Sequence, residues 1–240
     1  MLAIITGTIK PDSSMTQLVI KDERERMRQY VDSLLFFIKS GAFRKIVFCD
    51  NSNYGTKSLS FLKQTADEHC VNLEMLSFQG DVKMITKHGK GYGEGEIMSY
   101  VFQHSELVRD EEFFVKITGR MKIDNIKKIV SYMKKNKTYF NIPNYTIKDI
   151  YDTRIYGMPV KQFKEYFLNG FIRVQDDEGI YLEHVYTDIL KNEGIKVANF
   201  PRYPRIVGIS GSTGNVYGYT EWKCKIKDIL SLFNSYKVKI

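Results

Sequence analysis

The strongest constraint on the fold is an alternation of apolar runs and amphipathic segments in the first 80 residues. Segments from about residue 22 to 40 and from about 56 to 69 repeat apolar side chains at helical spacing. Three apolar runs around them have the composition of buried strands: LAIITGTI (2–9), RKIVFC (44–49) and NLEMLSF (72–78). This β-α-β-α-β order favours a parallel sheet with right-handed crossovers. We therefore predict an α/β, Rossmann-type fold with a mixed, mostly parallel sheet flanked by helices.

Polar residues end the first two predicted strands. Thr6-Gly7-Thr8 follows the first apolar run, and Asp50-Asn51 follows the second. Parallel α/β sheets bind ligands at the carboxyl ends of their strands, so these two tips should meet at one edge. The sequence therefore predicts a ligand site there.

Four alternate glycines lie in the segment KHGKGYGEGE, at positions 89, 91, 93 and 95. Glycine suits a loop that needs positive φ or close approach to a ligand. We predict a glycine loop that leads into a helix, where Lys87, Lys90 and the backbone N–H groups of the helix entrance would hold a diphosphate. A flexible lid or a plain turn is the alternative. The segment matches neither G-x-x-x-x-G-K-[ST] nor G-x-G-x-x-G, so an ATPase and a dinucleotide-dependent oxidoreductase are not supported.

A short apolar strand, FFVKIT, ends in Gly119-Arg120. One interpretation is a core strand whose Lys116 points outward and whose Arg120 pairs with a carboxylate. The functional interpretation places Lys116, Thr118 and Arg120 beside the glycine loop, where two cations would stabilise a departing nucleoside diphosphate.

The predicted helices and strands of the second half of the chain are shorter and less regular, but no linker or repeat separates this half from the first. A chain of 240 residues with 43% hydrophobic content can bury one good core, and we predict a single domain. TRIYGMP reads as a strand and turn, and LEHVYTDIL as a helix. The last helix, predicted over residues 221–236, has apolar residues at core spacing: Trp222, Ile226, Ile229, Leu230 and Phe233.

Composition narrows the function classes. Cys49, Cys70 and Cys224 lack metal-ligand spacing and are predicted to be core thiols, and with four histidines and no paired ligand motif we expect no zinc site. The net charge of +8 favours a phosphorylated or polyanionic partner, or an anionic membrane surface. No apolar run reaches the roughly 18 residues needed to span a bilayer, and the N-terminus has no signal-peptide pattern. We expect a cytoplasmic protein.

At this point the order of motifs resembles a known family. TGTIKP, then Arg26 and Tyr30 in R-x-x-x-Y, then CDNSN, KGYGEGE and FVKITGR are similar to bacterial glycosyltransferases that build capsules, O-antigens, lipopolysaccharide or related surface glycans. The resemblance covers most of residues 1–125 and weakens afterwards. It implies a GT-A-like fold in which residues 1–125 form the nucleotide-sugar-binding half and 126–240 the acceptor-binding half of one domain.

The resemblance also implies roles for single residues. It places Thr6, Gly7 and Thr8 at the nucleoside, and Asp50 and Asn51 at the base or ribose. The donor pocket would be completed by residues of the two central segments: Lys90, Gly91, Glu94, Gly95, Glu96, Thr118 and Gly119. Typical members carry a metal-binding D-x-D at the end of the strand that here reads KITGR, and this sequence has no aspartate there. We therefore expect Lys116 and Arg120 to replace the divalent cation at least in part, so that no metal is essential.

An inverting transfer needs a base for the acceptor hydroxyl. Glu183 in LEHVY is the first candidate, although it could equally be a helix-surface carboxylate; the alternatives are Asp176, Asp177 and Glu178. Aromatic and hydrogen-bonding side chains of the loop-rich segment would close over a sugar acceptor: Tyr203, Tyr217, Tyr219, Arg202, Arg205 and the SGSTG run.

We therefore expect transfer of a sugar from a nucleotide-sugar donor, UDP-linked, to a glycan or lipid-linked acceptor. Lysine-rich helices would add peripheral contact with the anionic inner face of the cytoplasmic membrane. Another nucleotide-sugar transferase or nucleotidyltransferase, for example one with a cytidine monophosphate donor, is the enzymatic alternative. A basic nucleic-acid-binding protein is the other alternative, but no RNP-like, zinc-finger or helix-turn-helix motif supports it, and we expect no nucleic-acid partner.

Overall fold

The computed structural model describes residues 1–12, 19–55, 57–141, 150–209 and 214–232. Its main sheet has seven strands in the order β3-β2-β1-β4-β7-β6-β8. The first four are parallel neighbours: β1 (Leu2–Gly7), β2 (Lys45–Asp50), β3 (Asn72–Ser77) and β4 (Phe113–Thr118). The predicted β-α-β-α-β order and α/β class are confirmed.

The second half of the chain adds three more strands to this sheet, of which one, β7, runs antiparallel to β4. β7 (Asp152–Pro159) runs antiparallel to β4, so its first residues lie beside the carboxyl end of β4. The sheet continues through β6 (Thr138–Asn141) to β8 (Val197–Ala198). A three-stranded sheet joins β5 (Met121–Ile123), β9 (Ile206–Ile209) and β10 (Val216–Tyr217). Both halves of the chain therefore contribute residues to the edge of the sheet at the carboxyl ends of β1, β2 and β4.

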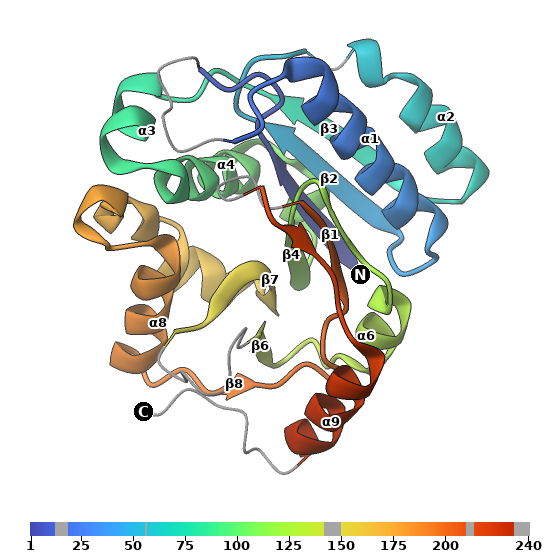
Figure 1. Ribbon diagram of the computed structural model, residues 1–240, viewed down its shortest axis with the longest axis vertical. Helices are drawn as coiled ribbons and strands as arrows, with labels where there is room; N and C mark the ends of the chain where they lie inside the picture. Colours follow the sequence, from blue (N-terminus) through green and yellow to red (C-terminus); the bar gives the residue numbers. More distant parts are fainter. Residues whose placement is uncertain (13–18, 56, 142–149, 210–213, 233–240) are drawn as a thin grey trace.

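Helices cover both faces of the main sheet (Figure 1). Alternate residues of β1 divide between two cores: Ala3 and Ile5 pack toward α1 (Glu23–Lys39), α2 (Phe61–Glu68) and α6 (Ile126–Tyr132). Leu2 and Ile4 pack toward α4 (Lys90–His104) and α8 (Leu182–Asn192). The other helical elements are η1 (Lys57–Leu59), α3 (Val82–His88), α5 (Glu106–Arg109), α7 (Val160–Gln162), η2 (Phe163–Phe167), η3 (Gly170–Arg173), η4 (Asp176–Glu178) and α9 (Glu221–Leu232).

The glycine-rich segment is a helix rather than the predicted loop. Gly89, with φ +95°, separates α3 from α4, and α4 then starts at Lys90. Gly91, Gly93 and Gly95 therefore lie inside the helix, where they allow close packing instead of supplying positive φ. The alternating spacing was misleading because glycine also marks close contact between a helix and its neighbours.

Gly95 makes the closest of these contacts, and its replacement by alanine should destabilise the fold. A Cβ atom at this position would lie 2.0 Å from the Cβ of Phe171 on η3. We expect Gly95→Ala to lower the free energy of unfolding by about 1–3 kcal/mol through overpacking, despite the better helix propensity of alanine. Gly93→Ala is the matched control in the same helix, because its nearest neighbour would be 3.3 Å away. Equal urea-denaturation midpoints for the two variants would contradict this packing role.

Two further expectations about the core are wrong in part. Cys49 and Cys224 are buried as predicted, but Cys70 is exposed. Trp222, Ile226 and Ile229 of α9 have the spacing of a core face, yet all three side chains are exposed. The predicted helix end at Phe233–Tyr236, and residues 210–213 of the SGSTG run, lie outside the described residues. Among the helices of the described ranges, none has the length and apolar character needed to cross a bilayer.

Candidate functional site

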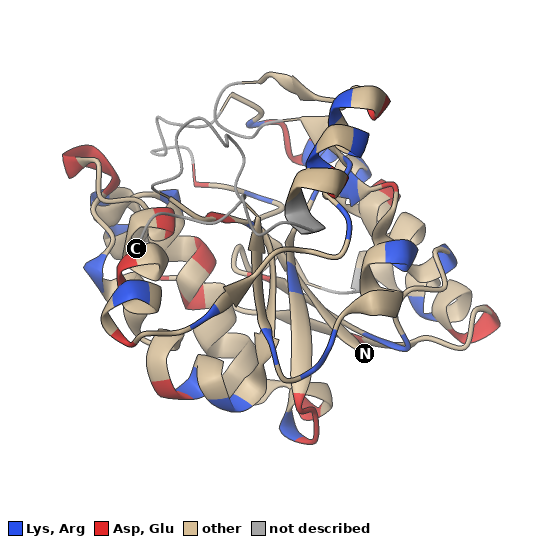
Figure 2. Ribbon diagram, turned by 90° about the horizontal axis from the view of Figure 1, so that it is seen from below, with Lys and Arg blue, Asp and Glu red and all other residues tan. Residues whose placement is uncertain are grey.

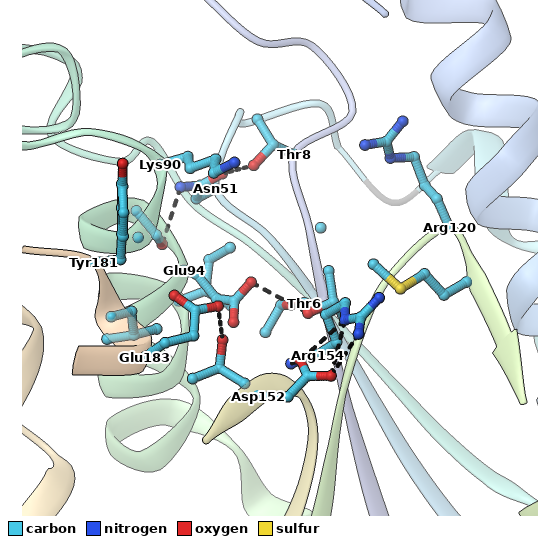
Figure 3. Close-up of a pocket in the computed structure, with 18 of the residues that line it drawn as sticks. Thr6, Thr8, Asn51, Lys90, Glu94, Arg120, Asp152, Arg154, Tyr181 and Glu183 are labelled. Atoms are coloured by element: carbon cyan, nitrogen blue, oxygen red, sulfur yellow. Dashed lines mark hydrogen bonds and ion pairs between the residues drawn. The ribbon is translucent and has the colours of Figure 1, made fainter. Parts of the chain in front are cut away.

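A cavity of about 420 Å³ opens at the carboxyl edge of the sheet, and we call it the central cavity. Its walls combine the tips of β1, β2 and β4 with α4, the start of β7, and α8 (Figure 3). The residues predicted for the site that line it are Thr6, Gly7, Thr8, Asn51, Lys90, Gly91, Glu94, Thr118, Arg120 and Glu183. The predicted convergence of strand tips is thus present in the structure.

Side chains from α1 and β2 fix the loop that follows β1. The Thr8 backbone N–H donates to the Tyr30 hydroxyl at 2.9 Å, and the Arg26 guanidinium donates to the Thr8 carbonyl at 2.8 Å. The Thr8 hydroxyl donates to Asn51 Oδ1 at 2.7 Å, as Figure 3 shows. Arg26 is buried, and burial lowers the pKa of its guanidinium. The R-x-x-x-Y pattern therefore holds a cavity wall in place.

Asp50 stabilises the same loop through hydrogen bonds and does not line the central cavity. Its carboxylate accepts hydrogen bonds from the Ile9 backbone N–H at 2.7 Å and from the Ser52 hydroxyl. The side chain is buried, with 2% of its surface exposed. Contact with a base or ribose, as predicted for Asp50, would require these bonds to break.

The start of α4 already holds a carboxylate. Asp176 on η4 accepts from the backbone N–H of Gly91, and the backbone N–H of Lys90 and the Lys90 charge also stabilise it. Burial nevertheless raises the pKa of Asp176. The helix entrance predicted to cradle a diphosphate is therefore occupied by a side chain of the protein, and Lys90 lines the cavity beside it.

Lys116 does not face the central cavity. Its side chain is completely buried on β4, and its ammonium contacts Glu94 Oε1, the Thr118 hydroxyl at 2.7 Å and the Thr153 carbonyl at 2.8 Å. The prediction that it stabilises the leaving group is wrong because its ammonium is bonded to Glu94 and Thr118, and these two residues line the cavity where Lys116 does not. Lys116 instead neutralises Glu94, which does line the cavity.

Glu183 lies at the floor of the central cavity, at the start of α8. Its Oε1 accepts a hydrogen bond of 2.7 Å from the Thr153 hydroxyl (Figure 3). Burial raises the pKa of the Glu183 carboxyl, and the nearby Glu94 charge raises it further, while the Thr153 bond opposes both. A carboxyl group of this kind is suited to proton transfer.

Arg120 forms the opposite wall in a strained conformation. Its φ of +64° is in the left-handed region, which is uncommon for a residue with a side chain. The guanidinium donates to Gln29 Oε1 at 3.0 Å and lies over the Tyr30 ring, 5.8 Å from its centroid. Its Nε is buried and has no hydrogen-bond partner among the described residues. The site therefore has a guanidinium cation in its wall.

A second charged group, from the start of β7, was not predicted from the sequence. Asp152 and Arg154 form an ion pair at 2.6 Å, and the Arg154 guanidinium stacks on the Tyr217 ring at 4.8 Å. All three residues line the central cavity. The available signal was the charged D-x-R at the beginning of an otherwise apolar strand.

The remaining predicted residues lie outside the cavity lining. Gly95 packs on Phe171, and Gly119 approaches the Thr6 carbonyl and the Tyr30 ring. Glu96 Oε1 accepts from the Asp81 backbone N–H at 2.9 Å. Of the predicted acceptor side chains within the described ranges, Tyr217 lines the cavity, and those that do not are Arg202, Tyr203, Arg205 and Tyr219. Of the alternative bases, Asp176 lines the cavity, whereas Asp177 and Glu178 are exposed.

Across the part of the chain that the structure describes, no group of three or more His, Cys, Asp or Glu side chains has the arrangement of a metal site. The carboxylates of the cavity pair with protein groups instead: Glu94 with Lys116, Asp152 with Arg154, and Glu183 with Thr153.

Comparison with known proteins gives only distant likenesses. No protein-family model matches this chain, and no curated protein matches its sequence. One similar solved structure is a nucleoside-diphosphate-sugar pyrophosphorylase from Vibrio cholerae RC9, with 10% identity over 83% of this chain and 91% of that chain, at a TM-score of 0.48. Another is HddC from Yersinia pseudotuberculosis, with 13% identity over 69% and 80% of the two chains, at a TM-score of 0.37. At these scores the likeness carries no argument about the site.

Proposed function

We propose that this chain is a glycosyltransferase that moves a sugar from a nucleotide-sugar donor to an acceptor hydroxyl. The observation that carries the proposal is the pairing of Arg120 and Glu183 across one cavity. Arg120 supplies a cation in the cavity wall, and Glu183 supplies a carboxyl group of raised pKa. Glycosyl transfer needs these two functions together, because negative charge develops on the leaving phosphate while a proton leaves the acceptor.

The donor would lie along the tips of β1 and β2. Thr6, Thr8 and Asn51 offer hydroxyl and amide groups to the nucleoside, while Lys90 and Arg120 face its diphosphate. In the transfer step the acceptor oxygen attacks the anomeric carbon, and the bond from that carbon to the phosphate oxygen breaks. Glu183 takes the acceptor proton, and the nucleoside diphosphate leaves with its charge stabilised by Arg120. Residues 1–125 thus supply most donor contacts, and residues 126–240 supply the base.

The acceptor would occupy the side of the cavity formed by β7, β10 and α8. Tyr217 offers an aromatic ring, and the paired Asp152 and Arg154 offer hydrogen bonds to hydroxyl groups. These groups suit a glycan, free or lipid-linked, as the resemblance implies. A uridine nucleotide is the donor type that the same resemblance favours.

Nucleotidyl transfer is the second candidate, because Lys90 and Arg120 would also suit a triphosphate. That reaction brings together two anions, a nucleoside triphosphate and a sugar phosphate, and its phosphate nucleophile needs no base. The cavity floor carries three carboxyl groups, from Glu94, Asp152 and Glu183, of which two are neutralised by ion pairs. A floor with no surplus of positive charge favours a neutral hydroxyl acceptor over a second phosphate.

Replacing Arg120 should lower transfer strongly. We expect Arg120→Met to reduce kcat by about 100- to 1,000-fold, since it removes a preorganised donor at the developing charge. Arg120→Lys should recover only part of the rate, because lysine lacks the planar fork of donors. Arg28→Met is the matched control on α1, where the arginine is exposed and pairs with Glu25. Steady-state kinetics with the preferred donor would reject the role if Arg120→Met and Arg28→Met behave alike.

A product assay separates the two candidate reactions. The protein is incubated with nucleotide-sugars and simple sugar acceptors, and in parallel with nucleoside triphosphates and sugar 1-phosphates, each with EDTA or with added Mn²⁺ or Mg²⁺. Sugar transfer releases a nucleoside diphosphate, or a monophosphate from a cytidine donor, and we expect it to continue in EDTA. Pyrophosphate release from triphosphate and sugar phosphate alone would overturn the proposal. Complete loss in EDTA, restored by Mn²⁺ or Mg²⁺, would show that a metal is required.

A further inference from the structure

Helix α9 turns an apolar face to solvent. Trp222, Ile226 and Ile229 are 60%, 45% and 57% exposed, and their spacing of four and three residues places them on one side of the helix. Cys224 and Asp228, four residues apart, are buried on the other side. A surface helix of a globular domain usually buries its apolar stripe, so this orientation needs a cause.

Polar contacts fix that orientation. Arg205 donates to Asp228 Oδ2 at 3.1 Å and to Glu221 Oε2 at 2.9 Å, and these two carboxylates lie on the side of α9 that faces the domain. Asp228 also accepts from the Tyr203 backbone N–H at 2.5 Å. Rotating the helix to bury Trp222 and the isoleucines would break these bonds. The buried Arg205 would then have lost its carboxylate partners on α9. The exposed apolar face is therefore built into the fold.

Basic side chains flank the apolar face. Lys223 and Lys225 are exposed on the two edges of the stripe. The view from below shows Lys and Arg segments on the helices, together with Asp and Glu segments (Figure 2). The whole chain has a net charge of +8.

We propose that the Trp222–Ile226–Ile229 face of α9 docks on an anionic lipid bilayer. A tryptophan and two isoleucines bordered by lysines match the composition of helices that lie in the plane of the membrane interface. The apolar side chains enter the boundary of headgroups and acyl chains, and Lys223 and Lys225 contact anionic headgroups. A second protein copy would bring equal positive charge to the same surface, and this argues against self-association as the use of the face.

The test is cosedimentation of the full chain with vesicles of phosphatidylcholine alone and of phosphatidylcholine mixed equally with phosphatidylglycerol. We expect binding to the mixed vesicles, a loss of at least about 30-fold in affinity for the Trp222→Ala/Ile226→Ser/Ile229→Ser variant, and a salt-sensitive loss of about tenfold for Lys223→Gln/Lys225→Gln. Phe61→Ser is the matched control, because Phe61 is 48% exposed on the distant helix α2.

Circular dichroism and melting temperature keep the test independent of folding. All three variants change exposed side chains, so their folded spectra should match the wild type. The proposal would be overturned by equal binding to neutral and anionic vesicles, or by unchanged binding of the triple variant. It would also be overturned if the protein bound no vesicles and formed a dimer in analytical ultracentrifugation that the triple variant abolishes. None of these outcomes depends on whether the central cavity transfers sugar.

Discussion

Glu183→Gln should lower kcat by about 100- to 10,000-fold, the range that a positioned general base contributes. Glutamine keeps the side-chain oxygen that accepts from the Thr153 hydroxyl, so the local hydrogen bond survives while the proton acceptor is lost. Donor affinity should stay near the wild-type value, because the carboxyl group is assigned to the acceptor side of the central cavity. Stopped-time product assays and donor titration measure the two quantities separately.

The pH dependence gives the same variant a second readout. The active form of Glu183 is the carboxylate, and burial raises its pKa, so wild-type kcat/KM should fall on the acid side at a pH above that of an ordinary glutamate. The residual activity of Glu183→Gln should lack this acid limb. Glu178→Gln is the control, because Glu178 is exposed and does not line the cavity. Near-normal turnover in Glu183→Gln would remove Glu183 from the mechanism.

The folding stability of Glu183→Gln should not fall with its activity. A folded-state pKa raised above the unfolded value means that the contribution of Glu183 to stability is lost as pH rises through the folded pKa. At neutral pH the glutamine variant should therefore be at least as stable as the wild type. This result would distinguish a catalytic loss from unfolding of α8.

Lys116→Met should be among the most destabilising single substitutions in the sheet. It removes the partner of Glu94 from a site where the lysine side chain has no exposed surface. Breaking a buried ion pair from one side costs about 3–5 kcal/mol, because the other charge stays in place without its counterion. We expect a loss in the lower part of this range, since Glu94 retains 22% exposure and the hydrogen bond from the Thr118 hydroxyl.

Two comparisons test this explanation by denaturant unfolding. Adding Glu94→Gln to Lys116→Met should recover part of the lost stability, because no unpaired carboxylate then remains. Lys45→Met on β2 is the matched control: its ion pair with Glu111 leaves the two side chains 34% and 13% exposed, so we expect less than about 1 kcal/mol. Equal losses for Lys116→Met and Lys45→Met would contradict the assigned role of the buried pair.

Local pattern predicted the parallel half of the fold well, because strand composition and helical periodicity are properties of neighbouring residues. The apolar run before Gly7 and the capped helix after Asp22 needed no long-range information. The direction of β7 did need long-range information, because it depends on pairing with β4. Without that direction the sequence could not show that Asp152 and Arg154 reach the same edge as Arg120.

The wrong placements have related causes. Lys116 was predicted either to point outward or to face the leaving group, and its burial could not be foreseen because its partner Glu94 lies on another element. The α9 stripe has core spacing, but contacts of Arg205 with Asp228 turn it outward. The glycines of α4 fit close packing partners that the sequence does not reveal, such as Phe171. In each case a tertiary contact overrode a valid local pattern.

The most direct test of the central claim is donor binding, measured by thermal shift with nucleoside diphosphates and their sugar conjugates, with and without Mn²⁺. A ligand at about 100 times its Kd stabilises the folded state by about 2.7 kcal/mol, which for a chain of this size raises the melting temperature by about 5–10 °C. We predict such a shift with at least one nucleotide-sugar and its nucleoside diphosphate, reduced in Arg120→Met. An unchanged melting temperature across the panel would contradict a nucleotide-sugar site in the central cavity.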